Sequence, residues 1–393
     1  MNDRESVKAA ILNIPNNNIL IELPTGHGKT AIALEILKTK LQKGNILVVV
    51  PRLVLKKNFM LEVKKWWKDC PLTFTLTTYR SLHKYTGNWD AVIYDEVHHL
   101  TPKCREIVPN INSQYSILLS ATVNRNLREI LYKIFPNLGY YKRTVREAID
   151  QEVLPDPKVY LLPLELDNST YSETIIKNPS FYKSIETDWS HRWKYIGKVK
   201  DTKIIIRCTK RQFIIDLDNQ IDWWKKRYIS TKKEQFKNIW LKLCSDRLKI
   251  LSNWKTNKCL DILKHLKNYR TLTFCNSIDQ TEVLGKYCIN SKNKLYQEVL
   301  NSFNEEKIKH ITACNMLDEG INLTNCRIGI YAALNSSERL IKQKLGRLLR
   351  HKDPIIIIPY YERTREEELV KTMLLDYNPN LVVTIKDLKE ITL

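Results

Sequence analysis

The stretch from Asn18 to Thr30 limits the folds open to this chain more than any other part of its sequence. It reads Asn-Ile-Leu-Ile-Glu-Leu-Pro-Thr-Gly-His-Gly-Lys-Thr, and the helix-forming run Ala31–Leu37 follows it. The apolar half predicts a buried strand, the glycines predict a turn, and the next segment predicts a helix. Glycines at such a turn let successive N–H groups converge, and the start of the helix adds its positive end. The sequence therefore predicts a phosphate-binding loop.

The residues of this loop have separate expected roles in binding ATP. Lys29 is expected to reach the β- and γ-phosphates, and the hydroxyl of Thr30 is expected to bind the Mg²⁺ ion that bridges them. Leu23 stands where the general motif has a glycine, whereas the Gly-Lys-Thr core is intact. The residues expected to hold the nucleotide are Pro24, Thr25, Gly26, His27, Gly28, Lys29 and Thr30.

A second motif lies at the end of another apolar strand. The run Ala91-Val-Ile-Tyr is followed by the adjacent carboxylates Asp95 and Glu96 and then by Val-His98. A carboxylate at a strand end beside a phosphate loop is placed to bind Mg²⁺, and its neighbour is placed to orient and deprotonate an attacking water. We therefore predict that Asp95 is a metal ligand and that Glu96 is the general base of nucleotide hydrolysis.

The composition favours an intracellular protein with a polyanionic partner. The chain has 393 residues and a formal charge of +21, which is spread along its length. Such a charge favours nucleic acid over a small acidic substrate, and charge alone leaves open a merely soluble basic protein. The nine cysteines include no Cys-x-x-Cys pair, so neither a zinc site nor a disulfide framework is indicated. With no signal-peptide core and no membrane-length apolar stretch, we expect cytoplasmic localisation, in a bacterium or in a host cell if the source is a virus.

Strand and helix signals alternate on both sides of a segment of different composition. Apolar runs predict strands at 46–50, 72–76, 91–94, 116–120, 271–275, 310–314, 327–331 and 355–358. The chain length favours two or three domains, and parallel sheets with ligands at their carboxyl edges fit this alternation. We expect a first domain at 1–150, a linker and first strand of a second domain at 151–168, an accessory insertion at 169–250 and the second domain at 251–393.

The segment 169–250 is unusually basic and aromatic. It has 19 Lys or Arg against 9 Asp or Glu, and it holds 12 of the 36 aromatic residues. Apolar residues recur at helical spacing, for example at Ile221, Trp224 and Tyr228, which favours a mainly helical subdomain with these rings in its core. Basic side chains beside exposed rings also fit a nucleic-acid strand, so Lys225, Lys226 and Arg227 are candidate phosphate contacts. A docking site for another protein is a third use left open.

The C-terminal half has a basic motif in place of a second phosphate loop. It reads Gln343-Lys-Leu-Gly-Arg347-Leu-Leu-Arg350, and Asp318-Glu319-Gly320 precedes it. Two arginines three residues apart share one helix face and can reach across a cleft to the charge on a transferring γ-phosphate. We therefore predict catalytic roles for Arg347 and Arg350, and Gly320 upstream completes the pattern.

These motifs, in this order, resemble those of superfamily 2 helicases and translocases, in particular phage or repair DNA helicases and the motors of type III restriction subunits. In the terms of that family, Pro24–Thr30 resembles motif I, the Asp-Glu-Val-His sequence at 95–98 resembles motif II in a DEVH form, and Gln343–Arg350 resembles motif VI. The resemblance assigns coupling roles to His98, Ser120 and Thr122, and catalysis to Gln343 with the two arginines. It also implies that Gly320 contacts the nucleotide. The nucleic-acid contacts that it implies are Pro51, Arg52, Thr78, Tyr79, Arg80 and Asn276.

The resemblance implies an α/β fold with two RecA-like parallel-sheet domains in tandem and a mainly helical, basic and aromatic insertion. It implies an ATP hydrolase that uses ATP and Mg²⁺ and acts on DNA by unwinding, annealing or branch migration. An RNA helicase, the motor subunit of a restriction or defence complex, and a non-motor clamp on nucleic acid remain as alternatives. The resemblance covers nearly the whole chain except 169–250.

Overall fold

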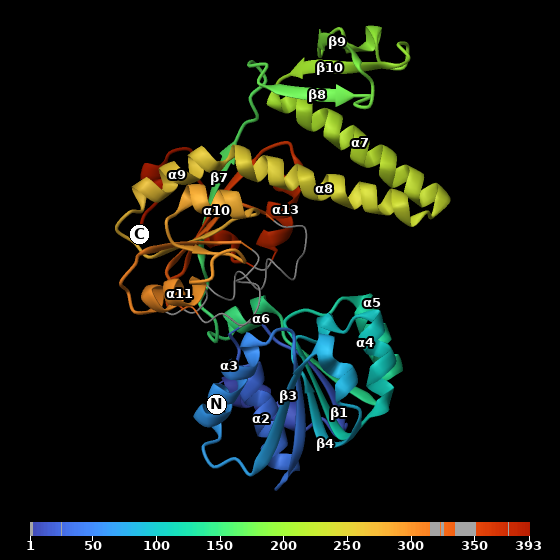
Figure 1. Cartoon of the computed structure of the whole chain (residues 1–393). Coiled ribbons are helices and arrows are strands. Elements are labelled where there is room, and N and C mark those ends of the chain that lie inside the picture. Colours follow the sequence, from blue (N-terminus) through green and yellow to red (C-terminus); the bar gives the residue numbers. More distant parts are fainter. Residues whose placement is uncertain (1–2, 25, 315–322, 324–325, 335–350, 376) are drawn as a thin grey trace.

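The N-terminal part of the chain folds into a sheet of six parallel strands with helices on both faces (Figure 1). The computed structural model describes residues 3–24, 26–314, 323, 326–334, 351–375 and 377–393. The strand order is β3-β2-β4-β5-β1-β6, so the loop-bearing strand β1 lies between β5 and β6. The strands are β1 (Asn18–Glu22), β2 (Gly44–Val50), β3 (Leu72–Thr78), β4 (Gly87–Tyr94), β5 (Ile111–Ser120) and β6 (Leu138–Lys142).

Alternate residues of these strands pack into two different apolar layers. Ile19 and Ile21 of β1 pack in the apolar cluster between the sheet and helices α1, α2 and α3, whereas Leu20 packs in the cluster between the sheet and helices α4 and α5. This two-sided burial explains why the strands are apolar at nearly every position, as expected of a parallel sheet. The helices are α1 (Asp3–Leu12), α2 (Lys29–Lys40), α3 (Val54–Trp66), α4 (Pro102–Ile107) and α5 (Arg125–Ile134), with 3-10 helices η1 (Tyr79–Lys84), η2 (Val97–His99) and η3 (Val108–Asn110).

A second parallel sheet of seven strands follows, in the order β12-β13-β11-β14-β15-β7-β16. Its strands are β7 (Lys158–Leu164), β11 (Thr271–Phe274), β12 (Cys288–Ile289), β13 (His310–Ala313), β14 (Ile328–Tyr331), β15 (Ile355–Tyr361) and β16 (Val382–Thr384). Its helices are α9 (Thr256–His265), α10 (Ile278–Leu284), α11 (Tyr296–Asn304) and α13 (Arg365–Leu374), with 3-10 helices η5 (Pro379–Leu381) and η6 (Leu388–Glu390). Strand β7 pairs with β15 although about half of the sequence separates them, so the segment after residue 150 contributes a strand to this sheet.

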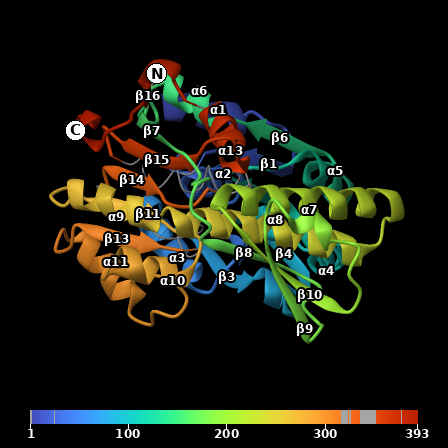
Figure 2. The ribbon, with the colours of Figure 1, turned by 90° about the horizontal axis from the view of Figure 1, so that it is seen from above.

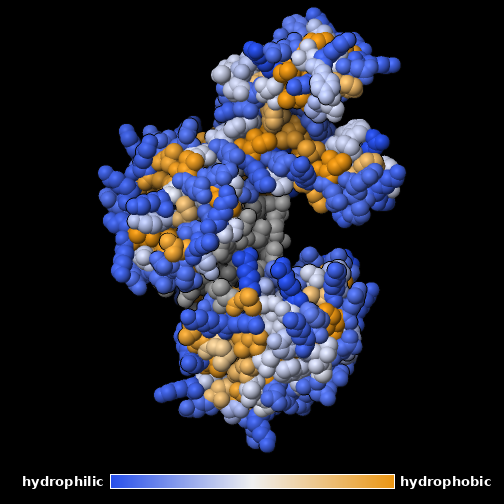
Figure 3. Space-filling model, in the orientation of Figure 1, coloured by the Kyte–Doolittle hydropathy of each residue, from blue (hydrophilic) through white to orange (hydrophobic). Residues whose placement is uncertain are grey.

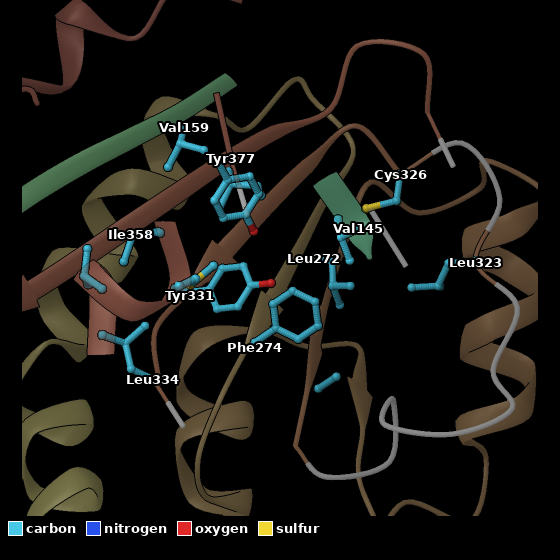
Figure 4. Packing of buried hydrophobic residues seen from close by; sticks show 14 of the residues in the cluster. Val145, Val159, Leu272, Phe274, Leu323, Cys326, Tyr331, Leu334, Ile358 and Tyr377 are labelled. Atoms are coloured by element: carbon cyan, nitrogen blue, oxygen red, sulfur yellow. The ribbon is translucent and has the colours of Figure 1, made fainter. Parts of the chain in front are cut away.

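The helix α6 (Val145–Asp150) packs on the second sheet, although it lies within the range expected for the first domain. Val145 lies beside Leu272 in the apolar cluster of that sheet, which also contains Phe274, Tyr331 and Ile358 (Figure 4). The contribution of α6 to this core was not visible in the sequence, because a short helix next to a domain limit fits either neighbour. The exact domain limits stay a prediction.

The segment 169–250 forms an arm that projects from the second sheet (Figure 1). Two long helices, α7 (Lys210–Thr231) and α8 (Glu234–Trp254), run side by side as a hairpin (Figure 2). The arm also contains a three-stranded sheet, β8-β10-β9, that the helical interpretation did not predict. Its strands are β8 (Glu173–Lys177), β9 (Lys183–Asp188) and β10 (Thr202–Cys208), with η4 (Arg192–Lys194) between the last two.

The predicted fold class is confirmed in its main feature, which is two parallel α/β sheets in tandem with an inserted arm. Helices hold most of the ordered residues of the arm, so the mainly helical description holds once the small sheet is added. The last turns of α8 belong to the second sheet and not to the arm, since Leu248 packs in the core of that sheet and Leu251 packs against Tyr361 of β15. Within the described residues, no helix is long and apolar enough to cross a membrane.

Candidate functional site

The predicted phosphate loop lies between the carboxyl end of β1 and the start of α2. Gly26 and Gly28 have φ values of 91° and 85°, a backbone conformation that side-chain-bearing residues rarely adopt. The turn places Lys29 at the first position of α2, where its Nζ lies 3.4 Å from the carbonyl oxygen of Leu23. The loop is tied to the neighbouring strand, because the N–H of Leu23 donates to the carbonyl of Ser120 at 3.1 Å. Thr25 lies outside the described residues.

Asp95 and Glu96 follow the carboxyl end of β4, as predicted. The N–H of Asp95 donates to the carbonyl of Val49 at 2.9 Å, and its own carbonyl accepts a hydrogen bond from the hydroxyl of Tyr79 at 2.8 Å. Glu96 has a positive φ of 48°, which is uncommon for a residue other than glycine. Backbone strain of this kind is concentrated at functional sites, where the surrounding structure holds it in place.

The structure brings residues of three predicted motifs into contact. Lys29 Nζ lies 3.7 Å from Glu96 Oε1, and both side chains are about nine-tenths buried. On the other side, Glu96 Oε2 lies 3.4 Å from Nδ1 of His98, which is also 3.3 Å from the hydroxyl of Ser120. The Ser120 hydroxyl donates to the carbonyl of Thr122 at 2.9 Å. A continuous chain of polar contacts therefore runs from the phosphate loop through Glu96 to Ser120 and Thr122.

Some buried polar atoms along this line of contacts make no hydrogen bond within the described part of the protein and so fit a polar ligand. Within the described residues, Glu96 Oε2 and Thr122 Oγ1 are buried and have no hydrogen-bond partner. A buried polar atom without a partner costs free energy, so such atoms are expected to meet a ligand, a metal or water when the protein works. The donor set of one lysine, one threonine hydroxyl and two carboxylates suits a nucleotide phosphate and a hard cation such as Mg²⁺. Thr30 and Asp95 are the residues that would hold the cation.

A cavity of about 560 Å³ opens beside this chain of contacts, on the α4 and α5 face of the sheet. Its lining includes His98, Thr122 and Glu22, a buried carboxylate at the end of β1. The Tyr140 hydroxyl donates to Glu22 at 2.5 Å, and Lys142 lies 3.7 Å away. Burial is the largest cause that raises the pKa of Tyr140, and the Glu22 carboxylate is the next; together they raise it to about 12. Glu22 was not predictable as part of the site, because an isolated Glu inside an apolar strand carries no motif.

The predicted nucleic-acid contacts of the first sheet lie at the same carboxyl edge but differ in exposure. Pro51 and the exposed Arg52 follow β2, while Thr78 ends β3 and Arg80 is exposed in η1. Tyr79 has a different environment, since its side chain is 5% exposed and bonds to motif II. Its ring therefore faces the protein interior and not a bound strand.

The remaining predicted contacts lie on the second sheet and on the arm. Asn276 follows β11, where its N–H donates to the side chain of Gln280 at 3.2 Å. Lys225, Lys226 and Arg227 are exposed near the end of α7. The Arg227 guanidinium lies 4.9 Å from the ring centroid of Trp223 and 5.0 Å from that of Phe236.

Four predicted site residues, Gly320, Gln343, Arg347 and Arg350, lie outside the described residues. Their roles in nucleotide contact and catalysis stay predictions. The strands on either side of them are described, and β14 and β15 pair directly in the second sheet.

Two family models match the chain. Residues 3–75 match the model of the type III restriction enzyme res subunit, and residues 254–352 match that of the helicase conserved C-terminal domain. The first match contains β1, the phosphate loop and α2, and the second contains most of the second sheet. The arm lies between the two matched ranges.

The chain is also similar to a characterised motor protein along most of its length. It is 24% identical over 356 residues to the DNA 3'-5' translocase XPB2 of Sulfurisphaera tokodaii, covering 85% of this chain and 75% of that protein. Among solved structures, it is similar to the ATP-dependent type ISP restriction-modification enzyme LlaBIII bound to DNA, with a TM-score of 0.56 and 12% identity. That match covers 98% of this chain but 31% of the longer restriction enzyme.

A second structural match has nearly the same length as this chain. Dbp5 of S. cerevisiae, bound to RNA and ADP BeF3, has a TM-score of 0.58 and 12% identity, and the match covers 98% of this chain and 90% of Dbp5. The structural matches show a shared tandem fold, and the family models and the XPB2 relative show the same motor class. The family models and the XPB2 relative therefore indicate that the chain is an ATP-hydrolysing helicase or translocase of the superfamily 2 type.

Proposed function

We propose that this protein is a translocase that uses ATP hydrolysis to move along DNA. The site around Lys29 and Glu96 is its hydrolytic centre. The observation that carries the proposal is the contact chain from Lys29 through Glu96 and His98 to Ser120. It joins the phosphate loop to the carboxylate pair and to the hydroxyls of the neighbouring strand. A structural lysine beside a glycine turn would not require these partners.

The roles of the residues follow from their positions. Lys29 and the backbone of the loop bind the β- and γ-phosphates, while Thr30 and Asp95 hold the Mg²⁺ ion, which neutralises phosphate charge when bound. Glu96 accepts a proton from a water as the water oxygen bonds to the γ-phosphorus and the bond to the leaving ADP oxygen breaks. Arg347 and Arg350 are assigned the role of stabilising the charge of the transferring phosphoryl group. Closure of the two sheets on ATP and reopening after hydrolysis would alternate the grip on a strand.

DNA is the polymer that the relatives favour. XPB2 is named as a DNA translocase, and the matched restriction enzyme was solved bound to DNA. The formal charge of +21 fits either nucleic acid. ATPase rates with single-stranded, duplex and forked DNA and with matching RNAs test the proposal. Stronger stimulation by RNA would favour the RNA helicase, and binding without any stimulation would favour the clamp.

The setting in which the motor works is part of the same proposal. The chain covers 31% of the restriction enzyme that it matches, and a role as the motor of a restriction or defence complex is the alternative setting. The arm offers one docking surface for a partner in such a complex. We place the protein in the cytoplasm, where ATP and nucleic acid are both available.

The end of the hairpin fits a grip on nucleic acid. Hydrophilic side chains gather at the end of the hairpin, and apolar side chains lie along the space between α7 and α8 (Figure 3). Trp223 is 51% exposed, and its ring centroid lies 4.5 Å from that of the partly buried Trp224, whose ring in turn packs on Phe236 at 5.5 Å. Exposed rings between cations suit base stacking together with phosphate contact.

Replacing Lys225, Lys226 and Arg227 together by Ala is expected to weaken nucleic-acid binding. The slope of log K against log salt concentration should flatten by about 0.7 to 0.9 for each lost phosphate contact. Fluorescence anisotropy at several salt concentrations measures this slope. The matched control replaces the exposed Lys286, Lys292 and Lys294 of the second sheet by Ala, which removes the same charge at a distance from the arm. Equal slopes for both triple variants would show that these residues of the arm do not contact the nucleic acid.

The two adjacent tryptophans are expected to respond differently to Ala substitution. Trp223→Ala should cost about 1–3 kcal/mol in nucleic-acid binding and leave the hairpin intact, since an exposed ring can stack on a base. Trp224→Ala should destabilise the hairpin by less than the roughly 3–5 kcal/mol of a fully buried tryptophan, because its ring is half-buried. Binding titrations and hydrogen exchange of α7 and α8 separate the two effects. If neither variant changes binding, the arm serves as a brace or as a protein docking site.

A further inference from the structure

Tyr79 connects two functional segments of the first sheet from a buried position. Its side chain is 5% exposed, and its hydroxyl donates to the carbonyl of Asp95 at 2.8 Å. Its ring centroid lies 6.1 Å from that of His99, and its own carbonyl accepts from the thiol of Cys104 at 3.4 Å. Because a carbonyl oxygen can only accept, the Tyr79 hydroxyl is the donor of the hydrogen bond to Asp95.

The hydrogen bond from Tyr79 is one of two that hold the backbone of the turn at Asp95 and Glu96, which we call the catalytic turn. The peptide N–H of Asp95 is held by Val49 of β2, and the carbonyl of the same residue is held by Tyr79. Glu96 follows directly, with its positive φ of 48°. A turn in an uncommon conformation needs its neighbours to fix it, and these two hydrogen bonds fix the residue before the expected general base.

The other end of the same segment faces the expected path of the nucleic acid. Thr78 and Arg80, two of the three contacts predicted here, flank Tyr79 in the chain; Thr78 is buried, whereas Arg80 is exposed. Leu82 of the same 3-10 helix is fully buried and shares an apolar cluster with Val97, which follows the catalytic turn. Because packed interiors transmit displacement, a shift of this helix on binding a strand must also move the turn.

We propose that Tyr79 is a positioning residue through which a strand bound at the exposed Arg80 sets the geometry of the Asp95–Glu96 turn. It acts through the peptide carbonyl of Asp95 and touches neither ATP nor nucleic acid. The proposal rests on the proposed function, because it concerns the coupling of nucleic-acid binding to hydrolysis. It gives a physical reason for a buried tyrosine directly before a strand contact.

The test compares the stimulated and the basal ATPase of Tyr79→Phe, which removes the hydroxyl and keeps the ring. The activator is poly(dT) or poly(U), whichever stimulates the wild type more strongly. The ratio of stimulated to basal kcat is expected to fall by about threefold to tenfold, the size of the loss of one neutral hydrogen bond. The KM for ATP without polymer is expected to change less than this ratio, since Lys29 and the loop are unaltered.

The matched control is Tyr94→Phe, which removes the hydroxyl of a buried tyrosine directly before the same turn and keeps its ring. The Tyr94 ring packs edge-on against Phe135 at 5.4 Å, on the α5 face. This variant is expected to keep the wild-type ratio of stimulated to basal kcat. An equal fall of stimulated and basal kcat in Tyr79→Phe would show a purely structural role and overturn the proposal, as would an unchanged ratio.

Hydrogen exchange provides a readout that is independent of turnover. In the wild type, the polymer is expected to change the exchange of amides in residues 95–100, and in Tyr79→Phe this change should be lost while polymer binding persists. A wild type that no polymer stimulates would instead contradict the proposed function, so the two failures are distinguishable. Persistence of the exchange response in Tyr79→Phe would show that coupling reaches the turn by another route.

Discussion

Glu96→Gln is expected to bind ATP and Mg²⁺ and to hydrolyse ATP roughly 10²–10⁴ times more slowly than the wild type, the usual contribution of a general base. The substitution keeps the size of the side chain and removes its capacity to accept a proton. The Glu96 carboxylate lies 3.7 Å from Lys29 and 3.4 Å from His98, so the amide can occupy the same space. Steady-state turnover and equilibrium binding of a fluorescent ATP analogue separate the two effects.

Two further variants make this test specific to Glu96. Lys29→Ala is expected to weaken nucleotide binding as well as turnover, since the lysine contacts the phosphates in both the ground state and the transition state. Asp90→Asn neutralises a carboxylate at the other end of β4, where it accepts the N–H of Asn45 at 2.7 Å, and turnover should stay close to wild type. Near wild-type turnover of Glu96→Gln would remove Glu96 from the mechanism.

The first sheet and its hydrolytic site were predictable because local patterns determine them. The apolar run of β1, the glycines and Lys29 lie within a dozen residues, and the strand before Asp95 is apolar at each of its last four positions. Parallel strands bring their carboxyl ends to one edge, so the order of motifs already implied that Lys29, Glu96 and Ser120 would meet. His98, to which the resemblance assigned a coupling role, lies between Glu96 and Ser120.

Long-range polar contacts were not predictable from local patterns. The resemblance implied that Tyr79 contacts nucleic acid, but its burial and a hydrogen bond to a residue 16 positions away give it another environment. Glu22 is similar, since its partner Tyr140 lies 118 positions away. The small sheet of the arm escaped prediction because β9 has mainly exposed or half-buried positions, and such strands lack the regular alternation that marks one buried face.

The buried ion pair of Lys255 and Glu366 shows the same limit of sequence reasoning. Both are fully buried and lie 2.6 Å apart, although a lysine at a helix junction and a glutamate in the first turn of α13 are usually exposed. Lys255 also donates to the carbonyl of Pro359 at 3.0 Å, and the N–H of Tyr361 donates to Glu366 at 3.0 Å. The pair joins the junction of α8 and α9 to β15 and α13, so it fixes the base of the arm to the second sheet.

Glu366→Ala is expected to lower the free energy of unfolding of the second sheet by about 3–5 kcal/mol, because it leaves the Lys255 ammonium buried without a counter-charge. Hydrogen exchange of the slowest amides in β15 measures this loss. Lys371→Ala on the same helix breaks an exposed pair with Glu367 and should cost less than about 0.5 kcal/mol. The double variant Lys255→Met with Glu366→Leu removes both charges, so it should be less destabilised than Glu366→Ala. A double variant as unstable as Glu366→Ala would mean that the loss comes from packing around α13 and not from the uncompensated charge.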